Sequence, residues 1–120
     1  MPYADARARA DQAVIDPNNV AFSHFCASPD LRVLMVRGEL DIATSGLFQH
    51  ELDDLLKTGI PRVEVDLAGV EFMDSSALSA LVGAHERARK SGQQFALLSP
   101  SPVCAKVLGI TGLDHIFELV

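Results

Sequence analysis

The sequence predicts a single α/β domain in which helices cover a mixed, mostly parallel sheet of about four or five strands. Two observations lead to this fold. Segments with the period of a strand alternate with segments with the period of a helix between residues 19 and 120. The chain also has 120 residues, of which 48% are hydrophobic, and this suits one domain with a substantial core.

The first stretch, residues 1–18, differs in composition from the rest. It is rich in Ala, Arg and Asp and ends near Pro17 and Asn18. Ala and Arg permit a helix, but no sustained apolar stripe gives such a helix a surface to bury. We therefore expect residues 1–18 to form a loose tail with at most a short helix, and the folded domain to occupy residues 19–120.

Two strands are expected at the start of the domain. Val20–Ala27 alternates weakly, as an edge strand does, and Pro29–Asp30 predicts a turn. Leu31–Val36 is apolar at nearly every position, which is typical of a strand covered on both faces. The short connection allows the two strands to pair in antiparallel fashion.

The first helix is expected after Gly38-Glu-Leu-Asp41, which ends the second strand. Asp41 or Thr44 is a suitable cap for this helix. Gly59, before Pro61, ends it. Its apolar face consists of Phe48, Leu52, Leu55 and Leu56.

The segment from Val63 to Val82 changes period in the middle. Residues 63–67 alternate as a strand does, and residues 66–73 are expected to form a short connection that contains Gly69. From Leu78 the apolar residues follow one face of a helix: Leu78, Leu81, Val82 and His85. His85 is therefore expected to be a packing histidine.

Asp74-Ser75-Ser76 stands between the two patterns, and all three residue types favour helix N-caps. The first turn of a helix has unpaired N–H groups and the positive end of the helix dipole, so a phosphate is favoured there. An ordinary cap explains the same residues, and the local pattern alone favours that simpler interpretation.

The remaining elements follow in the same alternation. Lys90-Ser-Gly92 ends the second helix, Gln94–Leu98 is a further buried strand, and Ser101-Pro102 opens a third helix as cap and first-turn proline. Gly112 ends that helix, and His115–Leu119 is expected to be a last short strand.

Three short motifs resemble one known family. Phe72-Met-Asp-Ser-Ser-Ala-Leu78 resembles the signature of the STAS domain, the family of bacterial anti-sigma factor antagonists. Gly38-Glu-Leu-Asp41 is similar to a second motif, and Ser99-Pro-x-x-Val103 with the following Thr111-Gly-Leu113 and Phe117 to a third. The resemblance spans about residues 20 to 120 and implies a STAS-like fold. Family members usually carry one more helix after the last strand, so we expect part of one sheet face to lack that cover here.

The resemblance also implies roles for individual residues. Ser76 matches the serine that a partner kinase phosphorylates, and Ser75 is the alternative acceptor. Asp41 matches an acidic residue near that serine, although a plain helix cap explains it equally well. Ala77 stands where the family usually has glycine, which would allow a kinase a closer approach. The expected partner-binding residues are Asp41, Asp74, Ser75, Ser76, Ala77 and Leu78.

The function implied by the resemblance is that of a phosphorylation-controlled binding module. Unphosphorylated, the protein is expected to bind an anti-sigma factor, a serine kinase of the histidine-kinase-like ATPase fold, and thereby free a sigma factor for transcription. A serine phosphatase restores binding. The alternative is a non-enzymatic STAS scaffold in a lipid-transport or stress-signalling assembly. A nucleotide-binding or other small-ligand domain has little support in the sequence, and the oligomeric state stays open.

Several other functions are disfavoured by the sequence. It contains no Gly-x-Ser-x-Gly, Gly-x-x-x-x-Gly-Lys or Gly-x-Gly-x-x-Gly motif, so we expect no enzyme and no cofactor. The net charge of −6 disfavours direct nucleic-acid binding. No apolar run is long enough to span a membrane and no signal peptide is evident, which predicts a cytoplasmic protein.

Histidines and cysteines offer no clear site. His24, His50 and His115 lack ligand-like spacing, so no metal is expected. Cys26 and Cys104 are expected to be small buried hydrophobes. A redox pair would require their Cα atoms to lie within about 7 Å of each other.

Overall fold

The computed structural model describes residues 14–16 and 19–120 of the chain. The strands are β1 (Val14–Asp16), β2 (Val20–Ser28), β3 (Leu31–Leu40), β4 (Arg62–Met73), β5 (Gln94–Leu98) and β6 (Glu118–Leu119). The helices are α2 (Ser45–Lys57), α3 (Ser75–Lys90), α4 (Pro102–Thr111) and the short 3-10 helix η1 (Leu113–His115).

The strands form one mixed sheet in the order β1-β2-β3-β4-β5-β6. β2 pairs antiparallel with β1 and with β3, because a short turn joins β2 to β3. The pairs from β3 to β6 are parallel, and a helix crosses over between the strands of each pair. These pairings confirm the predicted α/β fold with a mixed, mostly parallel sheet.

The sheet has one short strand more than the sequence predicted. β1 falls in the stretch expected to be a loose tail, and it pairs with β2 through Val14 and Phe22. Three residues give too short a pattern to reveal a strand, and the pairing uses backbone groups at the open edge of β2. The rest of the expected tail, residues 1–13 and 17–18, lies outside the described residues.

Two strand boundaries also differ from the prediction. β4 continues to Met73, through the stretch that was expected to be a connection. A register shift between Met35 and Arg37 lets β3 and β4 stay paired, so that Arg37 still faces Gly69. At the C-terminus, the expected strand from His115 is only β6, because η1 takes up the first part of that stretch.

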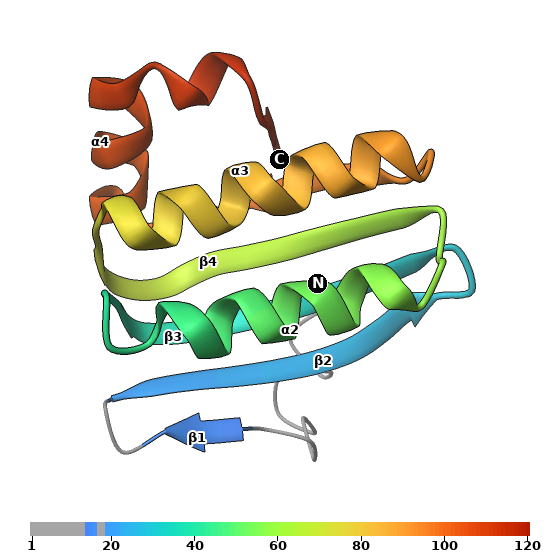
Figure 1. Cartoon of the computed structure of the whole chain (residues 1–120), viewed down its shortest axis with the longest axis horizontal. Coiled ribbons are helices and arrows are strands. Elements are labelled where there is room, and N and C mark those ends of the chain that lie inside the picture. Colours follow the sequence, from blue (N-terminus) through green and yellow to red (C-terminus); the bar gives the residue numbers. More distant parts are fainter. Residues whose placement is uncertain (1–13, 17–18) are drawn as a thin grey trace.

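The core lies between the sheet and its helices. α2 and α3 run side by side over one face of the sheet, here called the helix face (Figure 1). α4 joins the same core through Cys104 and Leu108. The largest fully buried side chains include Phe22, Phe48, Leu34, Leu52, Leu55, Leu67, Leu81 and Leu97. Each such side chain contributes about 1.5–3 kcal/mol relative to its exposed state.

β3 is buried on both faces, as its apolar run predicted. Leu34 and Val36 belong to the core on the helix face. Val33 and Met35 point to the opposite face, here called the far face, and are 0% and 7% exposed. The described helices are too short or too polar to cross a lipid bilayer.

The three cap residues expected for α3 and α4 stand where the sequence placed them. Asp74 is the N-cap of α3, and Ser101 caps α4 with Pro102 in its first turn. Gly112 ends α4 in the left-handed conformation, with φ of 76°. Thr44 is the N-cap of α2 by position, but its side chain accepts no capping hydrogen bond from that helix.

One prediction for the cysteines is wrong. Cys104 is buried, and this burial raises the pKa of its thiol. Cys26 is exposed instead, because it lies near the end of β2, where the Arg32 guanidinium donates a weak hydrogen bond to its sulfur at 3.8 Å. Both cysteines are free thiols. His85 packs edge-on against Phe95 and Phe117, which confirms its role in packing.

Candidate functional site

The candidate site begins at the junction between β4 and α3. The Asp74 carboxylate oxygen Oδ1 accepts hydrogen bonds from the backbone N–H groups of Ser76 at 3.0 Å and Ala77 at 3.3 Å. The same oxygen accepts a third hydrogen bond from the Ser76 hydroxyl, at 2.5 Å. One carboxylate therefore both caps the helix and holds the serine side chain.

The two neighbouring serines lie in different surroundings. Ser76 is half-buried and its Oγ is held by Asp74. Ser75 is exposed, and its hydroxyl makes no hydrogen bond within the part of the chain that the structure describes. Ser76 sits on the first turn of α3, where the helix dipole and the amide groups favour negative charge.

Asp74 is held in its charged form. Burial raises the pKa of its carboxyl group, but hydrogen bonds from the Ser76 hydroxyl and from the amides of Ala77, Ser76 and Ile42 lower it by more. The net pKa is below the ordinary value for aspartate, so the carboxylate is ionised at neutral pH. The Ser76 hydroxyl thus points at a negative charge.

The loop between β3 and α2 lies beside this junction. Because β3 and β4 are parallel and Leu40 pairs with Met73, both strands end at the same edge of the sheet. The Asp74 amide donates to the Leu40 carbonyl at 3.1 Å, which ties the two loops together. The structure therefore brings the Asp41 loop and the Asp74–Ser76 turn to one place.

Asp41 organises its own loop. Its Oδ1 accepts hydrogen bonds from the amides of Ala43 at 3.0 Å and Thr44 at 3.1 Å. The Thr44 hydroxyl, which is fully buried, donates to the Glu39 carbonyl at 3.0 Å. Asp41 thus fixes the turn before α2, but it is not the helix cap that the simpler interpretation expected, because the N-cap position is Thr44.

A shallow groove leads away from Ser76 between α2 and α3. Its volume is about 130 Å³. Ser45 and Gln49 line it from α2, and Ser79, Gly83 and Arg87 from α3. Small side chains on α3 leave room between the two helices.

Two large apolar side chains stand exposed next to the polar turn. Ile42 is 82% exposed and Phe72 is 46% exposed. Ala77 and Leu78, which were expected to touch a partner, are only 0% and 8% exposed and belong to the core. Ala77 and Leu78 therefore anchor the first turn of α3 to the core. Sequence reasoning missed Ile42, although an isoleucine directly after Gly38-Glu-Leu-Asp41 is an apolar residue in an otherwise polar turn.

One group of side chains among the described residues has a spacing that could hold a metal ion. The possible ligand atoms of His50, Glu51 and Asp54 all lie within 4.8 Å of one another. Glu51 is already engaged, since its carboxylate lies 2.6 Å from Nε2 of His24 on β2. This pair joins α2 to the sheet, and ordinary ion pairing also explains the arrangement.

The chain is similar in sequence and fold to several known proteins. A candidate anti-sigma factor antagonist from Thermotoga maritima is 34% identical over 91 residues, which cover 75% of this chain and 80% of the relative. A crystal structure of a candidate anti-sigma factor antagonist from Thermotoga maritima has a TM-score of 0.74 and 32% identity, over 82% of this chain and 84% of that one.

A further crystal structure shares the fold. The anti-sigma factor antagonist from Mycobacterium paratuberculosis has a TM-score of 0.77 at 24% identity, over 88% of this chain and 89% of that one. The family model of the STAS domain matches residues 27–120. This range contains the Asp41 loop, the Asp74–Ser76 turn and the groove. The chain therefore belongs to the STAS domain family.

Proposed function

We propose that the protein is an anti-sigma factor antagonist. In its unphosphorylated form it binds an anti-sigma factor and so frees a sigma factor for transcription. Membership of the STAS family and the descriptions of the relatives support this function. The observation that carries it is the turn in which Asp74 holds the Ser76 hydroxyl at the start of α3, next to exposed Ile42 and Phe72.

Ser76 is the residue that receives the phosphate. The Oγ–P bond forms as the bond between the γ-phosphorus of ATP and its bridging oxygen breaks, and the hydroxyl proton is released. The hydrogen bond from Ser76 to Asp74 is lost in the same step. The product is a dianion beside an ionised carboxylate, and the repulsion between them changes the surface that a partner meets.

The partner supplies the chemistry of this step. We assign that role to the anti-sigma factor, a kinase with a histidine-kinase-like ATPase fold that holds the nucleotide. A serine phosphatase reverses the modification. The protein itself acts as substrate and ligand, in the bacterial cytoplasm.

The contact surface is centred on the two loops at the edge of the sheet. Ile42 and Phe72 offer exposed apolar area on the two segments that meet at this edge, and protein interfaces gain most from such side chains when they are buried at the centre. Asp41 fixes the loop that carries Ile42. The groove between α2 and α3 extends the surface away from Ser76.

The test is a phosphorylation assay with a partner kinase of the same bacterium. The wild type, Ser76→Ala and Ser75→Ala are each incubated with the kinase and ATP, and the phosphate is mapped by mass spectrometry. We expect phosphate on Ser76 in the wild type and in Ser75→Ala, and none in Ser76→Ala. Phosphate on Ser75 alone would contradict the assignment. Stable kinase binding without any phosphorylation would favour the scaffold alternative.

A further inference from the structure

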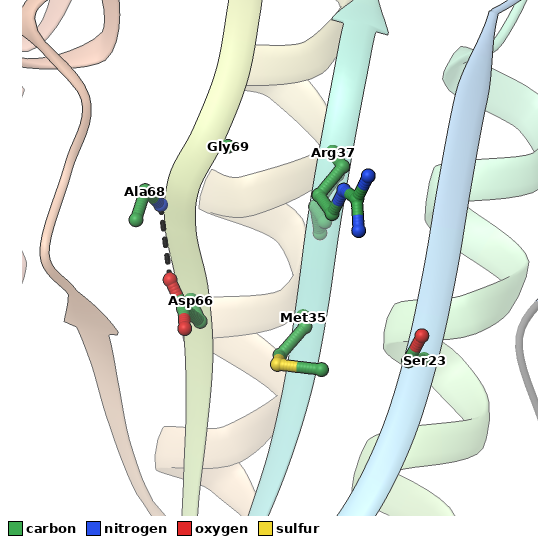
Figure 2. A pocket seen from close by; sticks show the side chains of 7 residues that line it. Ser23, Met35, Arg37, Asp66, Ala68 and Gly69 are labelled. Atoms are coloured by element: carbon green, nitrogen blue, oxygen red, sulfur yellow. Dashed lines mark hydrogen bonds between the residues drawn. The ribbon is translucent and has the colours of Figure 1, made fainter. Parts of the chain in front are cut away.

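A cavity on the far face of the sheet does not indicate one class of ligand. Its volume is about 270 Å³, and it lies over β2, β3 and β4, where Ser23, Met35, Arg37 and Asp66 line it (Figure 2). A cation and a carboxylate line the same cavity, and the carboxylate already accepts a hydrogen bond from the Ala68 amide at 2.9 Å. A more specific arrangement lies on the helix face, where α2 packs against β2.

Three side chains of metal-binding types converge on this side of α2. The possible ligand atoms of His50, Glu51 and Asp54 all lie within 4.8 Å of one another. Nε2 of His50 and Oδ2 of Asp54 are 3.4 Å apart. Two ligand atoms of a tetrahedral zinc ion, each about 2.1 Å from the metal, are separated by about 3.4 Å. His50 and Asp54 therefore already have the separation of two zinc ligands.

Glu51 offers the third ligand from a buried position. Its side chain is 8% exposed, and its Oε1 lies 2.6 Å from Nε2 of His24 on β2. Its Oε2 accepts no hydrogen bond within the part of the chain that the structure describes. A carboxylate that binds a metal is typically held by such an outer hydrogen bond, which fixes its orientation. The contact with His24 thus orients Glu51 and leaves one of its oxygens for an ion.

We propose that His50, Glu51 and Asp54 bind a zinc ion. An imidazole ligand favours zinc over magnesium and calcium, because these two ions prefer oxygen ligands. The two carboxylates balance the charge of a divalent cation, and three protein ligands leave one tetrahedral position for a water molecule. No metal was expected from the spacing of the histidines, but carboxylates of the same helix supply two of these three ligands.

The proposed zinc site lies on the side of α2 that faces β2. Glu51 contacts β2, whereas Asp53 points the other way and forms an ion pair with Arg87 of α3 at 2.6 Å. An ion at the site links two exposed side chains of α2 to a glutamate that is anchored on the sheet. Because the ion binds the folded chain, zinc should raise the melting temperature of the domain. This effect does not depend on Ser76 or on the proposed function.

Calorimetric titration of the untagged full-length protein with zinc chloride tests the proposal. A Cys26→Ser background removes the exposed thiol as a competing ligand. We expect one zinc ion per chain, and we expect His50→Ala and Asp54→Asn each to weaken its binding at least about tenfold, because loss of even an outer partner costs this much. The His50 and Asp54 side chains are 66% and 46% exposed, so both variants should fold.

His115→Ala in the same background is the matched control. His115 also lies near an aspartate, with Nε2 3.6 Å from Oδ1 of Asp114, but the described residues add no third ligand there. Its zinc affinity should stay unchanged. Zinc should raise the melting temperature of this control and of the Cys26→Ser protein but not of His50→Ala, and magnesium chloride should raise none of the three.

Three results would overturn the zinc site. The first is the absence of zinc binding, and the second is equal zinc affinity of His50→Ala and His115→Ala. The third is equal stabilisation by magnesium and by zinc, because the cluster would then attract any divalent cation through its charge and would not use the His50 imidazole as a ligand.

Discussion

Asp74 has two structural roles, as the cap of α3 and as the acceptor for the Ser76 hydroxyl, and only the first could be predicted from the sequence. As an aspartate before an apolar helical run it is recognisable as a cap, and it does cap α3. Its third hydrogen bond, from the Ser76 hydroxyl, depends on the rotamers of both side chains. The residue types therefore predicted the capped turn, and the family resemblance singled out Ser76, but neither indicated that the two side chains would be bound to each other.

Replacing Asp74 separates capping from charge. We expect Asp74→Ala to lower the free energy of unfolding by about 0.5–2 kcal/mol, because the first-turn amides lose their acceptor. Asp74→Asn keeps a capping oxygen and should lose less. Chemical denaturation of the two variants and the wild type measures the difference. Equal stability of all three proteins would show that the cap contributes nothing.

The stabilising effect of Asp74 should depend on pH. Burial raises the pKa of this carboxyl group, but the hydrogen bonds to it lower the pKa by more, to below its value in the unfolded chain. Its contribution is therefore fully present above the unfolded-state pKa of about 3.9 and is lost as the pH falls through the folded-state pKa. The stability difference between the wild type and Asp74→Asn should shrink in denaturation curves recorded below about pH 4. A difference that stays constant into strong acid would contradict this.

Among the elements, β3 depends on one glycine. Gly38 has φ of 100°, and a Cβ atom placed there would lie 2.1 Å from the Asn19 carbonyl oxygen. β3 carries the chain past this point to Asp41, so the backbone at Gly38 positions the loop beside Ser76. The sequence showed a glycine at the end of a strand but not the close approach of Asn19, which lies far from it in the chain.

Gly38→Ala should therefore be clearly destabilising. A side chain at this position is both strained and in collision with backbone, so we expect a loss of more than about 1 kcal/mol. Gly46→Ala is the matched control, because nothing lies within 4 Å of a Cβ there. It should be neutral or stabilise α2 by up to about 1 kcal/mol. A higher melting temperature for Gly38→Ala than for Gly46→Ala would show that the close approach of Gly38 to the Asn19 carbonyl is not important for stability.

The loop before α2 should contribute to partner binding through Ile42. Its side chain is 82% exposed, so Ile42→Ala should leave the stability of the domain nearly unchanged. Burial of a side chain of this kind in an interface is worth about 1–2 kcal/mol, so affinity for the anti-sigma factor should fall by about 5- to 30-fold.

Ile110→Ala is the control for this effect. Ile110 is 75% exposed but lies on α4, outside the two loops of the proposed surface. Calorimetric titration of both variants should show a loss for Ile42→Ala only. Equal losses would mean that the contact surface is larger than proposed, and unchanged binding for both would exclude Ile42 from it.

Long periodic elements were predictable because their side chains repeat the same environment. The helices α2 and α3 and the strands β2 to β5 all appear near their expected positions. The sequence did not predict the extents of β1 and β4, because backbone pairing between strands determines them. β1 forms on the edge of β2, and β4 runs past Gly69 because a register shift keeps it paired with β3.

At the scale of the whole molecule, the proposed switch is a local change of charge on a stable fold. A phosphate at a helix N-terminus is favoured by the helix dipole, by about 0.3–1 kcal/mol at an exposed site. The interface is affected differently, because a charge of about −1.5 to −2 has to be desolvated against the partner and next to Asp74. The domain should therefore tolerate the modification that its complex does not.

The arrangement of the whole molecule explains why the sequence did not predict which face of the sheet the helices cover. Val33 and Met35 were expected to be covered, and they are. That α2, α3 and α4 would all join the core on the helix face was not predicted, because this follows from the strand order β3-β4-β5-β6. The same strand order places the ends of β3 and β4 together at the proposed binding edge.

The most direct test of the switch compares unmodified protein, protein phosphorylated at Ser76, and Ser76→Ala. Each is titrated calorimetrically with the anti-sigma factor, and each is melted alone under the same conditions. We expect the unmodified protein and Ser76→Ala to bind alike. The phosphorylated protein should bind at least about tenfold more weakly, a loss of about 1.4 kcal/mol, with a nearly unchanged melting temperature. Full affinity after phosphorylation, or a loss of affinity that appears only because the phosphorylated domain has unfolded, would contradict a local switch at Ser76.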